Sequence, residues 1–385
     1  MNTKRMTANK LKIGLAAAFM IFGSTSAFSQ QQISLQEAIK LALENKAEAK
    51  KAALQIKKAE YKIAEARANA LPQINASAGL TYNPDIQESL LEFGGQRIRA
   101  QLGQPWISQA VVTVNQAIFD QRVFTGLKAA KSTREFYVLN AQLTNEQIIE
   151  NVATAYYQVY VQEENLKTLN VSYGNTEKVR DVIKSLVDNG LAKGIDLDRT
   201  NVQLTNISAN RQQIVNAVEL SKNSLKFYMG IPIETPIVLE DRNIEPKPEL
   251  IAGNVNLDTR TEVKVLEKNR ELLVYNKKAT EAYLYPTVGV QANYGWAGQG
   301  TKFPLTNGLN NGVLWSDYSA IGLNINIPIF TGGSTKAKIQ QAEIDILDLD
   351  QDIQNTQLSL SLEYKNAVTN MENALINIEN MESNV

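Results

Sequence analysis

Residues 321–329 read IGLNINIPI, and this stretch decides the fold. Its aliphatic side chains occupy every second position, and glycine or asparagine stands between most of them. A period of two places successive side chains on opposite faces of a β-strand. We therefore expect a strand with one apolar face and one face of small polar groups, ending near Pro328, where a helix should begin.

Three more segments alternate in the same way, at 74–83, 109–115 and 287–296, although Val111 interrupts the pattern in the second. Such strands fit a half-buried sheet of a soluble protein, whose apolar face lies against a core. They also fit a membrane β-barrel, whose apolar face contacts lipid while its polar face lines the lumen. The alternation alone leaves both architectures open.

The aromatic residues favour the barrel. All three tryptophans and three of the tyrosines stand at or just beyond the ends of the expected strands. Aromatic girdles are the expected rims of a lipid-facing band, with scattered surface aromatics as the alternative. Long polar connections at 84–107 and 297–317 point the same way. The predicted membrane-interface girdle consists of Trp106, Trp296, Trp315, Tyr82, Tyr294 and Tyr318.

Four strands are too few to close a barrel, because small closed barrels need about eight. The strands must therefore be shared between copies of the chain. Three copies would supply twelve strands and a comfortably open pore, and two or four copies also satisfy this argument.

The sequence outside the strands is largely helical. Residues 34–70, 123–188 and 195–228 carry aliphatic residues at spacings of three and four, which is typical of long helices. The third helix should end at Gly230, which can adopt a left-handed conformation, and Pro232, which forbids continuation. Helices of this length exceed what a globular core can use, so we expect them to pack as coiled coils.

Composition excludes many classes of protein. The chain has 385 residues, a net charge of −1, no cysteine and no histidine. It therefore has no disulfide, thiol nucleophile, Cys/His zinc site or Ser-His-Asp triad. The charge balance gives no basic footprint for nucleic acid, and a mean hydropathy of −0.24 is too polar for a bundle of membrane helices. We expect no enzyme activity and no catalytic, cofactor-binding or metal site.

Residues 1–29 are interpreted as a secretory signal peptide. Four basic side chains without an acid precede the apolar run 13–23, and small residues follow. Cleavage is expected after Ala27 or Ser29. An uncleaved membrane anchor is the alternative, but the run is shorter than the roughly 20 residues that a span needs.

The remaining chain contains an internal repeat. LPQINASAGLTY from Leu71 matches YPTVGVQANYGW from Tyr285, and VNQAIFDQ from Val114 matches INIPIFTG from Ile325. We divide the chain into the signal peptide, a first repeat at 30–232 with a helix, two barrel strands and a long helical hairpin, a segment at 233–284 with a short strand and a helix, and a second repeat at 285–385.

The order of these motifs resembles the TolC-like outer-membrane efflux protein family. Leu-Pro precedes the first strand, IFD and IFTGG follow strands, NGL marks a helix turn, and LKFYMGIP at 225–232 ends a helix. Each motif is short and degenerate, but their order and duplication are specific together. The resemblance covers nearly the whole mature chain.

This resemblance implies an α+β fold in which an outer-membrane β-barrel is continuous with a long periplasmic coiled-coil barrel of α-helices. The barrel would be shared between three protomers, with four strands each and twelve in total. The implied function is a passive outer-membrane exit duct for small molecules or proteins in a tripartite efflux or type I secretion system. Its partners would be a periplasmic adaptor protein, an inner-membrane pump and outer-membrane lipid, without nucleic acid. A periplasmic coiled-coil adaptor or scaffold is the alternative.

The resemblance also assigns local roles. Gly190, Leu191 and Ala192 match the helix-hairpin tip that contacts the adaptor, and an ordinary turn with an incidental leucine is the alternative. Asp196 matches a position in the polar network that keeps the periplasmic gate closed. Its alternative is an acidic residue in the first turn of a helix, which favours the helix dipole. Segment 233–284 resembles the equatorial belt of the family.

The second repeat is shorter than the first. The first runs from Pro72 to Pro232, whereas the second runs only from Pro286 to Val385. The family pattern places a second periplasmic turn and a second returning helix after this point. We interpret the chain as a truncated product or fragment, with a naturally shortened protein as the alternative.

Overall fold

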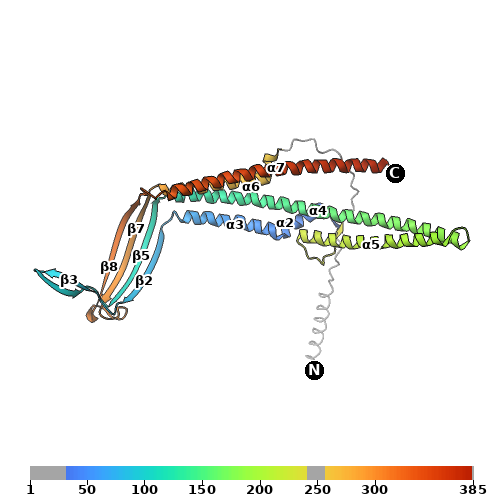
Figure 1. Cartoon of the computed structure of the whole chain (residues 1–385). Coiled ribbons are helices and arrows are strands. Elements are labelled where there is room, and N and C mark those ends of the chain that lie inside the picture. The colour runs from blue at the N-terminus through green and yellow to red at the C-terminus, as the bar shows by residue number, and fades with distance from the viewer. Residues whose placement is uncertain (1–31, 241–255, 384–385) are drawn as a thin grey trace, which may run out of the picture. The chain divides into compact units, whose positions relative to one another are not determined.

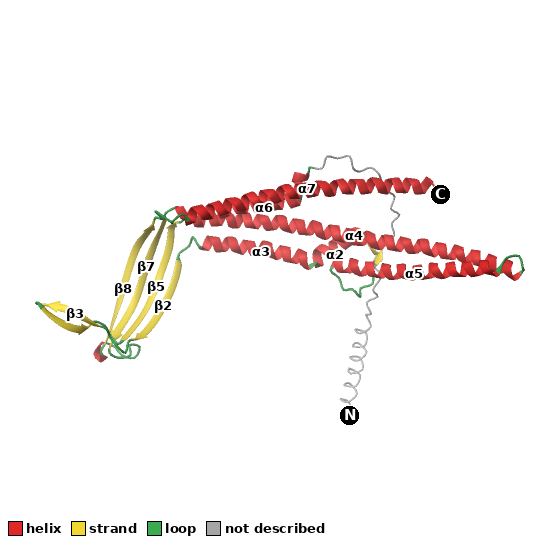
Figure 2. Cartoon of the chain, in the orientation of Figure 1, coloured by secondary structure: helices red, strands yellow, loops and turns green. Residues whose placement is uncertain are grey.

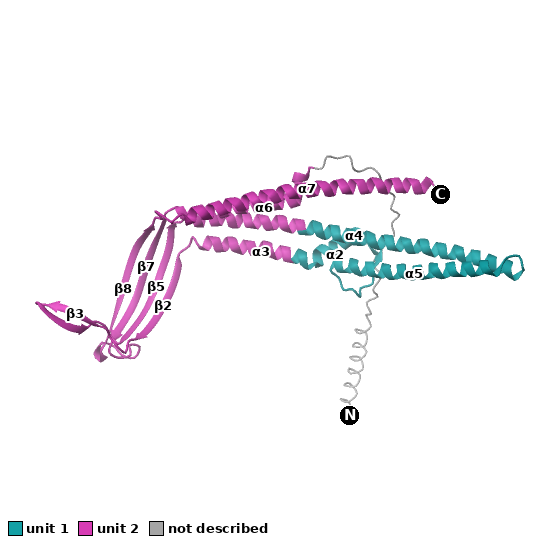
Figure 3. Ribbon diagram, in the orientation of Figure 1, with its two compact units in different colours: residues 1–50, 144–247 teal, residues 51–143, 248–385 magenta. Residues whose placement is uncertain are grey.

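The computed structural model describes residues 32–240 and 256–383 (Figure 1). The chain divides into two compact units, one formed by residues 1–50 and 144–247 and the other by residues 51–143 and 248–385 (Figure 3). The predicted signal peptide lies outside the described residues. In the described ranges, no helix is long and apolar enough to cross a membrane.

Long helices and a sheet make up most of the described chain (Figure 2). The helices predicted at 123–188 and 195–228 are confirmed, since α4 and α5 begin and end close to the expected positions. The helices are α2 (Leu35–Asn45), α3 (Ala47–Ala68), α4 (Gln121–Asp188), α5 (Gly194–Met229), α6 (Thr261–Glu281) and α7 (Ser334–Ser383).

The single helix predicted at 34–70 is wrong, because it breaks at Lys46 into α2 and α3. Lys46 has an extended backbone, with φ −59° and ψ 134°. The end of α5 packs against this break, and a Cβ on Gly230 would lie 3.1 Å from backbone atoms of both Asn45 and Lys46. The Lys46 ammonium also lies 3.9 Å from the ring centroid of Phe227. A tertiary contact therefore fixes the break within a continuous alanine-rich pattern.

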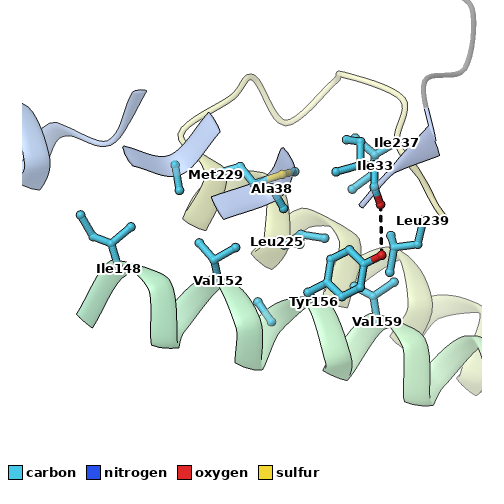
Figure 4. Close-up of a cluster of buried hydrophobic side chains, with 12 residues drawn as sticks. Ile33, Ala38, Ile148, Val152, Tyr156, Val159, Leu225, Met229, Ile237 and Leu239 are labelled. Atoms are coloured by element: carbon cyan, nitrogen blue, oxygen red, sulfur yellow. Dashed lines mark hydrogen bonds between the residues drawn. The ribbon is translucent and has the colours of Figure 1, made fainter. Parts of the chain in front are cut away.

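The first unit has its core where α4, α5 and α2 meet a small parallel sheet of β1 (Gln32–Ile33) and β6 (Val238–Leu239) (Figure 4). Tyr156 of α4 is buried in this core, and its hydroxyl donates a hydrogen bond to the carbonyl of Ile33 at 3.1 Å. The buried apolar residues are Ile33, Ala38, Ala42, Ile148, Val152, Ala155, Tyr156, Val159, Leu225, Met229, Ile237 and Leu239.

The second unit contains a four-stranded antiparallel sheet in the order β2-β5-β7-β8 (Figure 1). Its strands are β2 (Gln73–Tyr82), β5 (Trp106–Phe119), β7 (Thr287–Gly300) and β8 (Val313–Asn326). The four predicted strands are confirmed in number and order, but three of them are longer than expected or shifted.

The largest shift is in β8. It was expected over 321–329, but it begins at Val313 and ends at Asn326. Pro328 has no N–H to donate to a neighbouring strand. The chain then turns through Gly332 and Gly333, which both have positive φ, into α7.

The connection predicted at 84–107 contains a second, separate sheet. Strands β3 (Glu88–Phe93) and β4 (Gln96–Gln101) pair as a hairpin. Gly94 and Gly95 form its two-residue turn, with φ values of 61° and 84°. Positive φ at both positions is the requirement of a type I′ turn, which only glycine meets without strain.

The helices of the second unit are joined by ion pairs. Arg270 of α6 contacts Asp350 of α7 at 2.6 Å, and Lys277 pairs with Glu343 about two helix turns away. Lys268 of α6 also reaches Glu135 of α4 at 2.8 Å. These pairs align α6 with α7 and with the part of α4 in this unit.

Candidate functional site

The pairing register places most of the apolar residues of the four long strands on one face of the sheet, and Ile107, Val111 and Leu314 lie on the other. One row crosses the sheet from Ile74 to Val114, Ala292 and Ile321. Directly opposite residues of antiparallel strands point to the same face, so the neighbouring rows follow the same parity. We name this side the apolar face. It consists of Ile74, Ala76, Ala78, Leu80, Tyr82, Trp106, Ser108, Ala110, Val112, Val114, Gln116, Phe119, Val288, Val290, Ala292, Tyr294, Trp296, Gly298, Gly300, Val313, Trp315, Asp317, Ser319, Ile321, Leu323 and Ile325.

The apolar face is open to its surroundings in the single chain. Ile321 is 83% exposed, Leu323 64% and Ile74 68%. A contiguous apolar surface of this kind is a contact site in soluble and membrane proteins alike, because leaving it in water costs about 25 cal/mol for each Å².

Aromatic rings gather toward one end of the apolar face. Tyr82 and Trp106 are cross-strand partners with ring centroids 4.5 Å apart, and Tyr294 meets Trp296 edge to face at 4.6 Å. Trp315 packs over Gly298, where an added Cβ would fall 2.6 Å from the indole. The missing side chain of Gly298 is what allows the ring to lie flat on the sheet.

Tyr318 is not part of this aromatic group, unlike the other predicted girdle residues. It pairs with Gly295 on the opposite face, and its ring covers that glycine, so that a Cβ there would meet the phenol ring at 2.6 Å. The other five predicted girdle residues share the apolar face, and their role at a membrane interface stays a prediction.

Asp317 is a feature that the sequence analysis missed. It lies on the apolar face opposite Trp296, and the hydroxyl of Tyr294 donates a hydrogen bond to its Oδ2 at 3.2 Å. The predicted connection at 297–317 includes Asp317, so its carboxylate was not assigned to a strand. The alternation of Val313, Trp315 and Asp317 with Leu314 and Ser316 was the available signal.

The other side of the sheet carries small and amide side chains, and we name it the amide face. Its central row runs from Asn75 through Thr113 and Asn293 to Ala320. It consists of Gln73, Asn75, Ser77, Gly79, Thr81, Ile107, Gln109, Val111, Thr113, Asn115, Ala117, Thr287, Gly289, Gln291, Asn293, Gly295, Ala297, Gln299, Leu314, Ser316, Tyr318, Ala320, Gly322, Asn324 and Asn326.

A helical tip in the first unit is the other candidate site. After α4 ends at Asp188, Gly190 adopts φ +75° and the N–H of Leu191 donates to the carbonyl of Leu186 at 2.8 Å. This hydrogen bond is part of the motif with which many helices end at a left-handed glycine. Leu191 is 76% exposed and Ala192 is half-buried. The tip therefore presents Leu191 to its surroundings, and Ile195 at the start of α5 is 53% exposed as well.

Asp196 lies in the first turn of α5, as its alternative interpretation expected. Its carboxylate lies 3.6 Å from the guanidinium of Arg199, which is exposed. Its backbone carbonyl accepts a hydrogen bond from the Thr200 hydroxyl at 2.9 Å. Within one chain, Asp196 thus has a local partner, and its role in a gate stays a prediction.

Comparison with known proteins identifies the family. The family model described as "Outer membrane efflux protein" matches residues 38–230 and 254–385. The probable efflux pump outer membrane protein TtgC of Pseudomonas putida is 23% identical over 328 residues, which are 81% of this chain and 62% of TtgC. The outer membrane protein TolC of Escherichia coli is 22% identical over 376 residues, 92% of this chain and 71% of TolC.

A solved structure shows the same fold. The outer membrane protein VceC of Vibrio cholerae superposes with a TM-score of 0.66 at 20% identity, over 84% of this chain and 75% of VceC. The match to TtgC, by comparison, covers about three fifths of the length of that protein. The family match covers the long helices, the four paired strands and the glycine tip described above. The chain belongs to the outer membrane efflux protein family.

Proposed function

We propose that this chain is the outer-membrane channel subunit of an efflux or type I secretion system, through which small molecules or proteins leave passively. A partner pump in the inner membrane supplies the energy. The observation that carries this proposal is the exposed apolar face of the sheet, with aromatic rings gathered toward one end. That pattern is typical of a lipid-facing strand surface.

The strand order supports closure by copies of the same chain. The sheet has open edges at β2 and β8, and successive strands alternate in direction from β2 to β8. With an even number of strands, β8 of one copy runs antiparallel to β2 of the next. A ring of three copies therefore continues the antiparallel pattern through twelve strands and leaves no edge, as a membrane sheet requires.

The helical tip supports contact with a periplasmic adaptor. Leu191 is exposed on a turn that glycine and backbone hydrogen bonds hold in shape, so it can enter a groove between helices of a partner. Asp196 lies one turn away on α5, where copies around a central axis would bring several carboxylates together as a gate.

A charge placed on each face of β8 tests the membrane assignment. Ile321 lies on the apolar face, and its neighbour Ala320 lies on the amide face. Arginine facing lipid at mid-membrane costs about 2–4 kcal/mol per chain, whereas lumen positions tolerate it. We expect Ile321→Arg to abolish outer-membrane assembly and Ala320→Arg to preserve it.

The measurements are recovery of the full chain in outer-membrane fractions and conductance after reconstitution in planar lipid bilayers. Ion-conducting oligomers from the wild type and the Ala320→Arg variant would support the proposal. Equal assembly of the two variants, or a chain that stays in the periplasm without conductance, would refute it and favour a coiled-coil adaptor or scaffold.

A further inference from the structure

We infer that the amide face forms a charge-neutral wall that solutes of either charge sign pass equally well, so the strand region of the channel does not select by charge. This inference rests on the proposed function, in which the amide face lines the lumen. It assigns substrate discrimination to other parts of the assembly and predicts that cations, anions and zwitterions are all accepted by this segment.

The first observation is the distribution of charge. Among the described residues of β2, β5, β7 and β8, Asp317 is the single charged side chain, and it lies on the apolar face. Charged residues resume only past the strand ends, with Asp120 after β5 and Lys302 after β7. The absence of charge is therefore confined to the sheet and extends across its amide face.

The second observation is what replaces the charges. Amide side chains recur along the face, with Gln73, Asn115 and Gln291 in one row and Asn75 and Asn293 in the next. Each amide offers both hydrogen-bond donors and an acceptor. An amide that is open to solvent can therefore solvate an anion through its NH₂ group and a cation through its oxygen, without favouring one sign. The Oδ1 of Asn293 is buried in the single chain and does not contribute.

The third observation is the low relief of the face. Glycines contribute no side chain at positions 79, 289, 295 and 322, and Tyr318 lies flat over Gly295. A wall of short side chains keeps the lumen wide. Ring-shaped arrays of acidic or basic side chains are how channels select by charge, and this face provides neither.

The cysteine-free chain permits a direct test with single cysteines. Asn293 lies on the amide face and its neighbour Ala292 on the apolar face, so Asn293→Cys and Ala292→Cys form a matched pair. Asn293 is about 20 Å from either end of β7 at 3.3 Å per residue, beyond the Debye length of about 8 Å in physiological salt. Charges at the strand ends are therefore largely screened at this position.

Each reconstituted variant is reacted with a cationic and an anionic methanethiosulfonate reagent, and each rate is divided by the rate with a free thiol. We expect Asn293→Cys to react with both reagents at normalised rates within threefold of each other, and Ala292→Cys to be protected by lipid. A second position on the amide face, Gln291→Cys, should give the same result.

A deliberately charged wall is the control. Gln291→Glu combined with Asn293→Cys puts a carboxylate two residues away on the same face, at about 7 Å. Coulomb attraction at that distance should raise the ratio of cationic to anionic rates at least about twofold, even with the dielectric constant of water.

The outcomes separate the two proposals. A ratio beyond threefold in either direction for Asn293→Cys, or no response to the added carboxylate, overturns the neutral wall while leaving the channel in place. Reaction at Ala292→Cys together with protection at Asn293→Cys and Gln291→Cys reverses the faces and overturns the proposed channel as well.

Discussion

Replacing Gly230 by alanine should loosen the packing of α5 against the break between α2 and α3. Gly230 has φ +70°, and a Cβ there would lie 3.1 Å from the backbone of Asn45 and Lys46. The left-handed conformation costs a non-glycine residue about 1–2 kcal/mol, and forcing a methyl group into a packed site costs about 1–3 kcal/mol. We therefore expect Gly230→Ala to destabilise this region by about 2–5 kcal/mol.

Gly190 provides a matched control. It has φ +75°, and both helices end with the same pair of hydrogen bonds, from Gly190 to Val187 and Leu191 to Leu186 in one and from Gly230 to Phe227 and Ile231 to Lys226 in the other. An added Cβ at Gly190 meets nothing within 4 Å. Gly190→Ala should therefore cost only the conformational part, about 1–2 kcal/mol.

Native-state hydrogen exchange of the full chain measures both effects, because it reports local opening without reversible global unfolding. Amides of α2 should exchange faster in Gly230→Ala, since that helix is pushed by the new methyl group, and remain unchanged in Gly190→Ala. Equal protection of α2 in the two variants would refute the view that close packing at Gly230 fixes the break.

Three further substitutions, and Leu220→Ala as a control, test the core and an ion pair. Leu225→Ala, at a fully buried position, should cost about 2–5 kcal/mol in unfolding free energy, whereas Leu220→Ala, at a position 68% exposed, should change it by less than about 0.5 kcal/mol. Chemical denaturation of the detergent-solubilised chain compares the two, and similar losses would contradict the assigned core. Tyr156→Phe should cost about 0.5–1.5 kcal/mol, because the Ile33 carbonyl loses this donor but keeps its hydrogen bond from the Glu240 N–H, and faster exchange around β1 would reveal it. A hydrogen bond from Arg270 lowers the pKa of Asp350 in the folded state. The ionised carboxylate therefore stabilises the fold fully at pH values above the pKa of an unfolded aspartate, about 4. This contribution is lost as the pH falls through the lower pKa of the folded state. Asp350→Asn should weaken the α6–α7 contact at pH 7 and flatten its pH dependence, and an unchanged acid profile of exchange in α7 would argue against this pair.

The alternation of strands was readable from sequence because it reports directly which residues face which side. Ile321, Leu323 and Ile325 are indeed on one face, and the register extends that face across all four strands. The same parity would have excluded Tyr318 from the girdle, because it stands at an even-numbered position while the apolar face of β8 uses odd ones. The strand was predicted to begin only at Ile321, so Tyr318 was treated as a residue beyond its end and its face was not considered.

Other features were not readable for physical reasons. The break at Lys46 interrupts no local pattern, because it depends on contact with Gly230, far along the chain. The start of β8 was missed since Ser316, Asp317 and Ser319 dilute its hydrophobicity. By contrast, the β3–β4 hairpin had a local signal, the pair Gly94 and Gly95 between short alternating segments.

One candidate site could be predicted from a local motif, and the other depends on how distant strands pair. A turn with glycine predicts the helical tip, and the structure supplies the exposure of Leu191 that sequence could only suggest. The hydrogen bond between Tyr294 and Asp317 joins two strands, so it follows from register rather than from any motif.

The position of β7 in the sheet has a consequence for how a newly made chain reaches this fold. β5 obtains its second neighbour only from β7, and α4, α5 and α6 lie between these strands in the sequence. Pairing of distant segments is slow, because the intervening chain must be ordered before the contacts form. The β2–β5 hairpin therefore exists for a time with an unpaired edge, during which it is prone to aggregate with other chains. In the proposed ring the β2 and β8 edges stay open for longer still, until copies of the chain meet, so protection from aggregation is needed until assembly.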